Sequence, residues 1–235
     1  MLDNGGEVHI VLKNMKIDKT FMNKQVYEGL KDMIIQNQLK PGEKLSIEKI
    51  AQELEVSRTP VNIALTNLQR DGYVTILPQS GTFVRELNAG ELEITFKSRA
   101  VLEKLIVETY GSHISKDVLY KLREQWEGYF RQESYCPEDL TRLFELDTML
   151  HGVLSDTCHD IIRREVLNIA DLTKRSRILL LKDMMKNPDG RKVREINIKF
   201  HIDIIHAIMA GAYADAAQLV YTDIMRTWEE VKNMR

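Results

Sequence analysis

The sequence has few of the features that hold together small secreted domains or anchor a chain in a membrane. It contains only two cysteines, Cys136 and Cys158, among 235 residues. They form no close pair, which fits reduced thiols better than a disulfide framework. No apolar run reaches about 18 residues, and the N-terminus lacks the basic start and apolar core of a signal peptide. These absences predict a cytoplasmic protein without a membrane partner.

A strong charge of one sign is also absent. The formal net charge is -2, so no global basic field indicates nucleic acid. Hydrophobic residues make up 43% and charged residues 29%, which favours a packed core over disorder. The length suggests one large or two modest domains. Residues 1–19 show little pattern and are interpreted as an N-terminal extension.

The most informative stretch is SRTPVNIALTNLQR, from Ser57 to Arg70. Ser57 is a suitable N-cap whose hydroxyl could accept a first-turn amide, and Pro60 falls in that first turn. An apolar stripe repeats at helical spacing, while the opposite face has cations, amides and hydroxyls but no carboxylate before Asp71. Such a face can approach phosphates and base edges. An ordinary amphipathic helix with a solvated face is the alternative reading of this stretch alone.

The flanking sequence favours the DNA-binding interpretation. Periodicity predicts a first helix over 21–38, ended by Pro41 and Gly42, and a second, short helix over 46–54 that Ser46 caps. After Asp71 and Gly72, the segments 73–76 and 82–85 are β-rich and a turn separates them. Three helices followed by a hairpin predict a winged helix-turn-helix domain over residues 20–87.

Residues 20–87 resemble the DNA-binding domain of the GntR family. The matching pieces are PGEKL, IAQELEVSRTPV, DGYV and the GTFV wing. The resemblance implies a transcriptional regulator that binds a palindromic double-stranded operator as a homodimer, with Arg58 reading a base and with Thr59 and Thr82 at phosphates or the groove edge. The residues expected to face DNA are Ser57, Arg58, Thr59, Asn62, Thr66, Arg70 and Thr82.

Two positions depart from the family pattern. Asn62 lies where the family usually has a second recognition arginine, and Glu48 lies where many members carry an arginine. Because asparagine prefers adenine and arginine prefers guanine, these departures predict a diverged operator.

The rest of the chain is predicted to be helical. The expected fold is therefore mainly α, with the winged helix-turn-helix followed by an all-α antiparallel helical bundle over residues 91–233. A break is expected over 186–190. The expected helices of this second domain are 91–110, 117–132, 138–158, 160–185, 191–210 and 215–233.

Polar residues within the predicted bundle suggest a binding site. Asp147 and His151 are four residues apart and share a helix face among leucines, while His201 lies among isoleucines of another helix. Buried polar groups need partners. One explanation is a divalent metal held between helices. In the alternative, Asp147 pairs with His151, and His201 is satisfied without a metal.

Residues 91–230 resemble the FCD (FadR C-terminal) domain of one GntR subgroup. The matches are Arg99 and Glu103 in R-x-x-x-E, FELDTMLHGVL, and FHIDIIHAIMAG, and the six-helix count resembles the VanR-like branch. The resemblance implies zinc, nickel or manganese bound by one aspartate and three histidines. By position these are Asp147, His151 and His201, but Asp223 stands where the fourth histidine is expected.

The same resemblance implies a small carboxylate effector that completes the metal's coordination. Arg99 is the residue assigned to the effector carboxylate, because its planar fork suits one; Glu103 and Arg142 are the further candidates. The alternative for Arg99 is a helix pair with Glu103. Arg175 and Arg177 could also line the cavity.

The sequence thus predicts a ligand-responsive transcriptional regulator, not an enzyme. One alternative is a regulator for which the metal ion itself is the signal, and another is a regulator whose pocket is empty. A metal-dependent enzyme built on Asp147, His151 and His201 is the last alternative. It would need a general base or nucleophile, and the sequence offers none at a convincing spacing.

Overall fold

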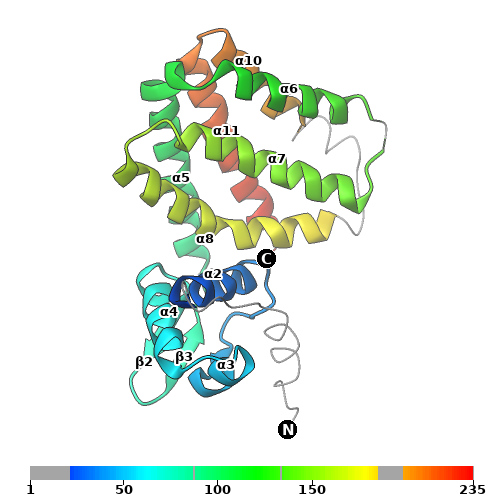
Figure 1. Ribbon diagram of the computed structural model, residues 1–235. Coiled ribbons are helices and arrows are strands. Elements are labelled where there is room, and N and C mark those ends of the chain that lie inside the picture. Colours follow the sequence, from blue (N-terminus) through cyan, green and yellow to red (C-terminus); the bar gives the residue numbers. More distant parts are fainter. Residues whose placement is uncertain (1–21, 87, 133, 185–197, 235) are drawn as a thin grey trace. The chain divides into compact units, whose positions relative to one another are not determined.

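The computed structural model describes residues 22–86, 88–132, 134–184 and 198–234, and its contacts divide the chain between Asn88 and Ala89 into two compact units (Figure 1). The predicted extension over residues 1–19 lies outside the described residues. Within the described ranges, no helix combines the length and the apolar character that crossing a bilayer requires. Each unit is described by itself below.

The first unit packs three helices around one apolar core. These are α2 (Met22–Ile35), α3 (Ile47–Glu53) and α4 (Arg58–Arg70). Leu30 of α2 and Leu65 and Leu68 of α4 are almost fully buried, and each such side chain stabilises the fold by roughly 1.5–3 kcal/mol. The apolar stripe that the sequence predicted for α4 therefore faces the core, which leaves its polar face free.

The ends of these helices follow the predicted capping chemistry only in part. Ser46 caps α3, because its hydroxyl accepts a hydrogen bond from the Lys49 amide at 3.3 Å. Ser57 occupies the N-cap of α4, but its hydroxyl makes no such bond, so that expectation was wrong. At the other end, Gly72 adopts a φ of 86°, and the Tyr73 amide donates to the Leu68 carbonyl at 2.8 Å. This Schellman-type stop turns the chain from α4 into the hairpin.

The hairpin belongs to a three-stranded antiparallel sheet with strand order β1-β3-β2. Its strands are β1 (Lys44–Leu45), β2 (Val74–Leu77) and β3 (Gly81–Val84). Val74 pairs with Val84, and Leu77 pairs with Gly81, where the turn begins. The two wing strands lie within one residue of the predicted segments. The sequence did not predict β1, since two residues are too short to show a period.

The second unit is built from helices alone in its described residues, which confirms the mainly helical prediction. The bounds differ by a few residues from the predicted ones: helix α7 ends at Ser155 and not near Cys158, and α11 begins at Tyr213. The predicted break over 186–190 and the start of a helix at 191 lie outside the described residues. The helices are α5 (Ala89–Tyr110), the 3-10 turn η2 (Gly111–His113), α6 (Lys116–Phe130), α7 (Pro137–Ser155), α8 (Asp160–Met184), α10 (Lys199–Met209) and α11 (Tyr213–Asn233).

Helices α5 and α11 lie side by side along this unit, and α7 and α8 lie against α5 (Figure 1). Phe96 of α5 and Trp228 of α11 pack with ring centroids 5.6 Å apart, and both are buried. Several charged residues are buried in the same core, among them Arg99, Glu103, Arg177 and Asp223. Buried charges require partners, and these partners define the site described next.

Candidate functional site

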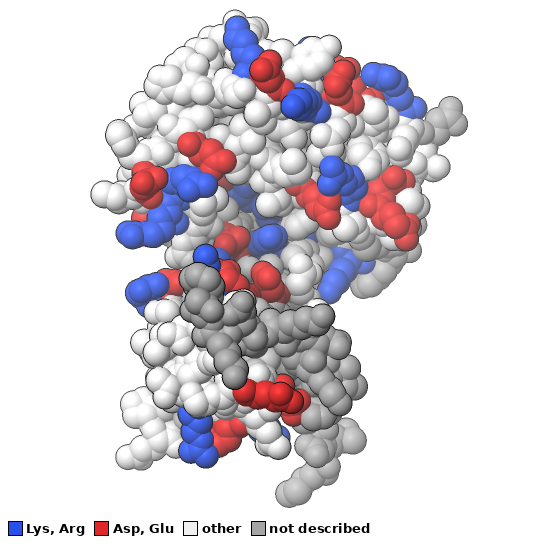
Figure 2. Space-filling model, viewed as in Figure 1, with Lys and Arg blue, Asp and Glu red and all other residues white. Residues whose placement is uncertain are grey.

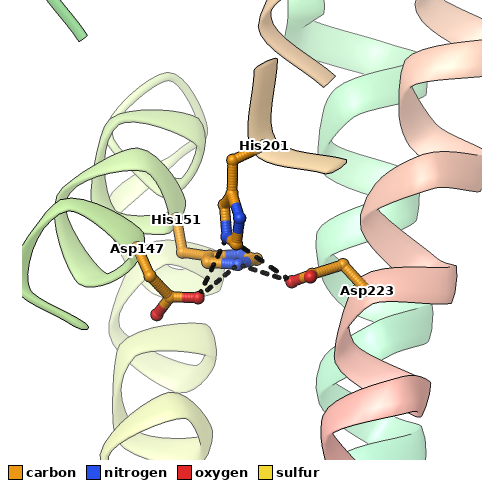
Figure 3. Close-up of side chains that lie close together, drawn as sticks. All are labelled: Asp147, His151, His201 and Asp223. Carbon is orange, nitrogen blue, oxygen red and sulfur yellow. Dashed lines mark hydrogen bonds and ion pairs between the residues drawn. The ribbon is translucent and has the colours of Figure 1, made fainter. Parts of the chain in front are cut away.

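Four side chains from three helices converge inside the helical unit. Asp147 and His151 come from α7, His201 comes from α10 and Asp223 comes from α11, and their ligand atoms all lie within 4.8 Å of one another. Figure 3 shows the two imidazole rings between two carboxylates, which approach from opposite sides. The structure thus brings together all four residues that the sequence singled out as metal ligands.

The distances between these atoms suit a metal-sized gap. His201 Nε2 lies 3.1 Å from Asp147 Oδ1 and 3.9 Å from an Asp223 oxygen, and His151 Nε2 lies 3.3 Å from the same Asp223 oxygen and 3.7 Å from Asp147 Oδ1. In a tetrahedral zinc site with bonds of about 2.0–2.2 Å, neighbouring ligand atoms lie roughly 3.3–3.6 Å apart. Two imidazole nitrogens and two carboxylate oxygens are also a donor set that zinc, nickel and manganese accept.

The surroundings hold both imidazoles in place. His151 Nδ1 contacts a Glu103 carboxylate oxygen of α5, and this bond directs Nε2 toward the other three groups. Such an outer carboxylate fixes the tautomer of a ligating histidine. The ring of His201 stacks on Trp126 of α6, with centroids 4.4 Å apart and an interplanar angle of 8°. The donor atoms are therefore oriented before any ion arrives.

Buried ion pairs determine the electrostatics of this cluster. Burial by itself would raise the pKa of Glu103, but the Arg99 guanidinium and His151 outweigh it and lower that pKa to about 2. Arg99 Nε donates to Glu103 Oε1 at 2.6 Å, and both side chains are almost fully buried. Burial opposes a charge on His151, but Glu103 and Asp223 raise its pKa. Glu103 is therefore an ionised carboxylate within the protein core.

Replacing Glu103 by glutamine is expected to lower the free energy of unfolding at neutral pH by about 3 kcal/mol, because a buried cation loses its partner. The folded pKa of Glu103 is about 2, below its ordinary value of 4.5. Its stabilisation is therefore present above that ordinary value and is lost as pH falls toward 2. Urea unfolding followed by circular dichroism at several pH values measures both effects.

The difference in the free energy of unfolding between the wild-type protein and Glu103→Gln should decrease as pH falls from about 4.5 toward 2. Glu108→Gln, an exposed carboxylate of the same helix α5, is the matched control and should change little. A difference that stays constant through this window would contradict the proposed ionisation of Glu103.

A cavity of about 90 Å³ adjoins the four-residue cluster. Asp147, His201 and Asp223 form part of its wall, and Arg177 and Trp126 stand beside them. The remaining wall is largely apolar. Its other lining residues are Leu140, Leu143, Phe144, Leu180, Leu181, Met184, Arg226, Thr227 and Glu230.

The structure does not place the predicted effector-binding residues on this wall. Arg99 and Glu103 pair with each other behind the cluster, as in the alternative reading of R-x-x-x-E. Arg142 is exposed and donates to Glu145 and Gln125. These three residues therefore do not line the cavity, whereas Arg177, which the sequence named only as one of several possibilities, does.

The sequence did not indicate that Trp126 and Arg226 lie on the cavity wall. Trp126 follows Leu119 and Leu122 at helical spacing, so its position on the apolar stripe of α6 was readable. Its contact with His201 was not readable, because it depends on how α6 packs against α10. Nothing in the sequence distinguishes Arg226 from the other arginines of the helical unit.

The polar face of α4 is exposed as predicted. The exposed residues of this face are Ser57 at the N-cap and Arg58, Thr59, Asn62, Thr66 and Arg70 along the helix. These residues form an exposed polar surface along one helix.

Three side chains of the DNA-binding prediction have partners or positions that the sequence did not indicate. Arg58 Nη1 lies 3.4 Å from Glu48 Oε1 of α3, and both side chains are exposed. Arg70 pairs with Asp71 at 3.0 Å. Thr82 is only 4% exposed within the sheet, so its side chain does not reach a phosphate from this position and that expectation is corrected.

Neither sign of charge predominates on the face of the molecule drawn in Figure 2, where acidic and basic side chains are interspersed over the helical unit. This agrees with the nearly balanced composition. Local placement on α4 therefore carries the argument for nucleic acid, and the overall charge does not.

Comparisons with known proteins agree with the geometry of the first unit. The family model described as "Bacterial regulatory proteins, gntR family" matches residues 22–84. The HTH-type transcriptional regulator YdhC of Bacillus subtilis is 30% identical over 170 residues, which are 72% of this chain and 75% of that protein. The HTH-type transcriptional repressor RspR of Escherichia coli K12 is 25% identical over 218 residues, 91% of this chain and 90% of that protein.

Solved structures show the same fold along nearly the whole chain. A putative transcriptional regulator GntR from Rhodococcus sp. RHA1 has a TM-score of 0.69 at 21% identity, and E. coli McbR/YncC has a TM-score of 0.72 at 18% identity. In both cases the match covers 91% of this chain and 98% of the other. At such identities the likeness concerns the fold alone.

Proposed function

Because the chain belongs to the GntR family of bacterial regulatory proteins, we propose that it is a dimeric repressor controlled by a small carboxylate that binds together with a divalent metal. The family and the relatives make it a DNA-binding transcriptional regulator and not an enzyme. The metal, the carboxylate, the dimer and the sign of regulation are the proposed parts.

The proposed domains are residues 20–87 for operator binding and residues 91–233 for effector binding. In the first, the exposed face of α4 enters the major groove, and Arg58 at its start contacts a guanine. Further contacts to bases and phosphates come from the other exposed polar residues of this face, which are Ser57, Thr59, Asn62, Thr66 and Arg70. What supports this role is that the face carries these groups without a carboxylate between Arg58 and Arg70.

We assign the helical unit to the FCD subgroup, in its six-helix VanR-like form. The observation that carries the proposal is that Asp147, His151, His201 and Asp223 meet beside a cavity with an arginine on its wall. These four residues would hold zinc, nickel or manganese. A bound divalent metal supplies positive charge and a coordination position for a carboxylate oxygen.

A homodimer would place two recognition helices on a palindromic operator. Exposed apolar side chains on α5 support a contact between two copies of the helical unit. Ile94, Val101 and Leu105 share one face of this helix, and each is more than half exposed. Large apolar side chains gathered on one helix face are typical of interaction surfaces.

The proposal is tested by measuring metal content and operator affinity on the same sample. The purified protein is analysed for bound metal, and operators are selected from random DNA. Affinity is then compared with and without zinc and a panel of small carboxylates. A carboxylate that weakens operator binding only when zinc is present supports the proposal. Zinc-loaded protein whose operator affinity no carboxylate changes would contradict the carboxylate control.

The second candidate is a regulator for which the ion alone is the signal. The observation in its favour is that four ligand atoms already converge in the structure without an organic molecule. Titrating zinc against operator binding, with no carboxylate present, separates the two candidates. A full response to zinc alone identifies the ion as the signal.

Glu48 is expected to weaken operator binding, because it competes for Arg58. Replacing it by glutamine removes an exposed ion pair at 3.4 Å, which is worth at most about 1 kcal/mol in each copy. We therefore expect Glu48→Gln to tighten operator binding by roughly 2- to 30-fold over the two copies of a dimer. Fluorescence anisotropy at fixed salt measures the change, and Glu28→Gln, an exposed carboxylate of α2, controls for the lost negative charge. Unchanged or weaker binding by Glu48→Gln would show that Glu48 contributes a favourable contact.

A further inference from the structure

We propose that Asp147 holds Arg177 in the metal-free protein, and that metal binding frees Arg177 to receive a single carboxylate group. Arg177 is thereby the effector-binding arginine, and its availability depends on the ion. This inference rests on the proposed function, because it takes the four-residue cluster as the metal site. Beyond the proposed function, it specifies which arginine binds the effector, what charge the effector carries and how ion binding and effector binding are coupled.

The position of Arg177 is the first argument. Its guanidinium forms an ion pair with Asp147 Oδ2, while Asp147 Oδ1 faces His201 Nε2 at 3.1 Å. The same carboxylate is therefore shared between an arginine and the cluster. Arg177 is 7% exposed and lies on the cavity wall, with its guanidinium carbon 5.0 Å from the centroid of the Phe144 ring. A cation bound to Asp147 Oδ1 draws negative charge from this carboxylate and weakens its pair with Arg177, so the guanidinium can take a second carboxylate as partner.

The charges around the cavity give the second argument. Glu103 pairs with Arg99 and Asp147 pairs with Arg177, while Asp223 contacts the imidazole of His151. Three carboxylates and two guanidinium groups leave one negative charge in excess when both imidazoles are neutral. Arg226 and Glu230 on the wall balance each other. A divalent ion reverses the excess to one positive charge, and a monoanion restores neutrality. A buried charge without compensation is costly, so this site favours a monocarboxylate over a dicarboxylate.

The shape and polarity of the cavity give the third argument. The indole Nε1 of Trp126 is buried and has no hydrogen-bond acceptor among the described residues, so it offers a second donor to a carboxylate. The wall beyond it is made of leucines, Phe144 and Met184. A cavity of roughly 150 Å³ can hold benzene, and this one measures about 90 Å³. A short aliphatic monocarboxylate fits that volume.

The inference requires that metal and carboxylate strengthen each other's binding. We use butyrate as the probe, butyramide as its uncharged counterpart and succinate as the dicarboxylate. Zinc is supplied from a chelator buffer, and tryptophan fluorescence and calorimetry report binding to the whole protein. We expect saturating butyrate to lower the zinc dissociation constant roughly 10-fold, within the usual range of coupling between two sites. Butyramide should have no effect, and succinate should have a smaller effect than butyrate.

Variants of Arg177 test the mechanism of coupling. Arg177→Met should bind zinc roughly 10-fold more tightly without butyrate, because Asp147 is no longer shared, and butyrate should no longer change its zinc affinity. Arg164→Met, which removes an exposed arginine of the same helix α8 outside the cavity wall, should keep the coupling. Thermal unfolding checks that each variant is folded. Arg177→Lys is the second variant, and we expect it to keep the charge but only part of the coupling, because lysine lacks the planar fork.

The outcomes separate this inference from the proposed function. Failure of the wild-type protein to bind zinc would overturn both. Zinc binding that is indifferent to butyrate, together with unchanged zinc affinity in Arg177→Met, would overturn the role of Arg177 and leave the metal site standing. Equal strengthening by succinate and butyrate would overturn the inference of a monoanionic ligand. The measurements of zinc, butyrate and succinate binding use the wild-type protein and do not depend on the folding of a variant.

Discussion

Arg58→Ala is expected to abolish selective binding to operator DNA. A bidentate contact between arginine and guanine is worth about 1–3 kcal/mol, and a dimer makes two of them. The loss therefore corresponds to a decrease in affinity between roughly 30-fold and more than 10⁴-fold. Binding is measured on an operator selected by the wild-type protein, in competition with random DNA and at a stated salt concentration.

Arg58→Lys is the matched control for this experiment. Lysine keeps the positive charge but lacks the planar fork, so this variant should retain most non-specific binding and lose discrimination at one base. The side chain of Arg58 is 69% exposed and its one ion pair in the described residues is with Glu48. Neither change should therefore unfold the domain. Undiminished selective retention by Arg58→Ala would mean that α4 does not read the operator.

His201→Ala is expected to remove metal binding from the helical unit. One of four converging ligands is lost, and the stacking partner of Trp126 disappears with it. We expect zinc affinity to fall by at least about 100-fold, since loss of an outer-shell partner alone typically costs 10- to 100-fold. The rise in melting temperature on adding zinc should vanish as well. Elemental analysis after dialysis against a buffered chelator measures the first effect, and calorimetric unfolding measures the second.

His206→Ala supplies the control on the same helix. The side chain of His206 is 51% exposed and lies 3.8 Å from Glu127, outside the four-residue cluster. This variant should bind zinc as the wild-type protein does. Equal metal content in the two alanine variants would refute the assignment of His201 as a ligand.

The sequence predicted much of the first unit because its information is local. The polar and apolar faces of α4, the glycine turn after it and the wing hairpin each depend on neighbouring residues. The predicted hydrogen bond of the Ser57 hydroxyl is absent, because serine favours the N-cap position without ensuring the geometry of that bond. Strand β1 was missed because its pairing with β3 joins segments about forty residues apart, and no local period encodes it.

The sequence also predicted the four converging residues, because Asp147 and His151 share a helix face, His201 stands among isoleucines of another helix, and the resemblance supplied Asp223. It could not predict the contacts that give each of them its role. The bond from Glu103 to His151 spans 48 residues. The pair of Arg177 with Asp147 depends on how α8 packs against α7. Helix packing alone decided that Arg177, and not Arg99 or Arg142, lines the cavity.

The contact between Glu103 and His151 links helix α5 to helix α7, so a displacement of His151 acts on α5 as well. Glu103 lies 14 residues after Ala89, where this helix begins, and that distance along a helix is about 21 Å. A long helix moves nearly as a rigid rod, so a tilt of about 5° at Glu103 would displace its first residue by roughly 2 Å. A small displacement at His151 is thus enlarged along α5 by the time it reaches the first residue of the helical unit.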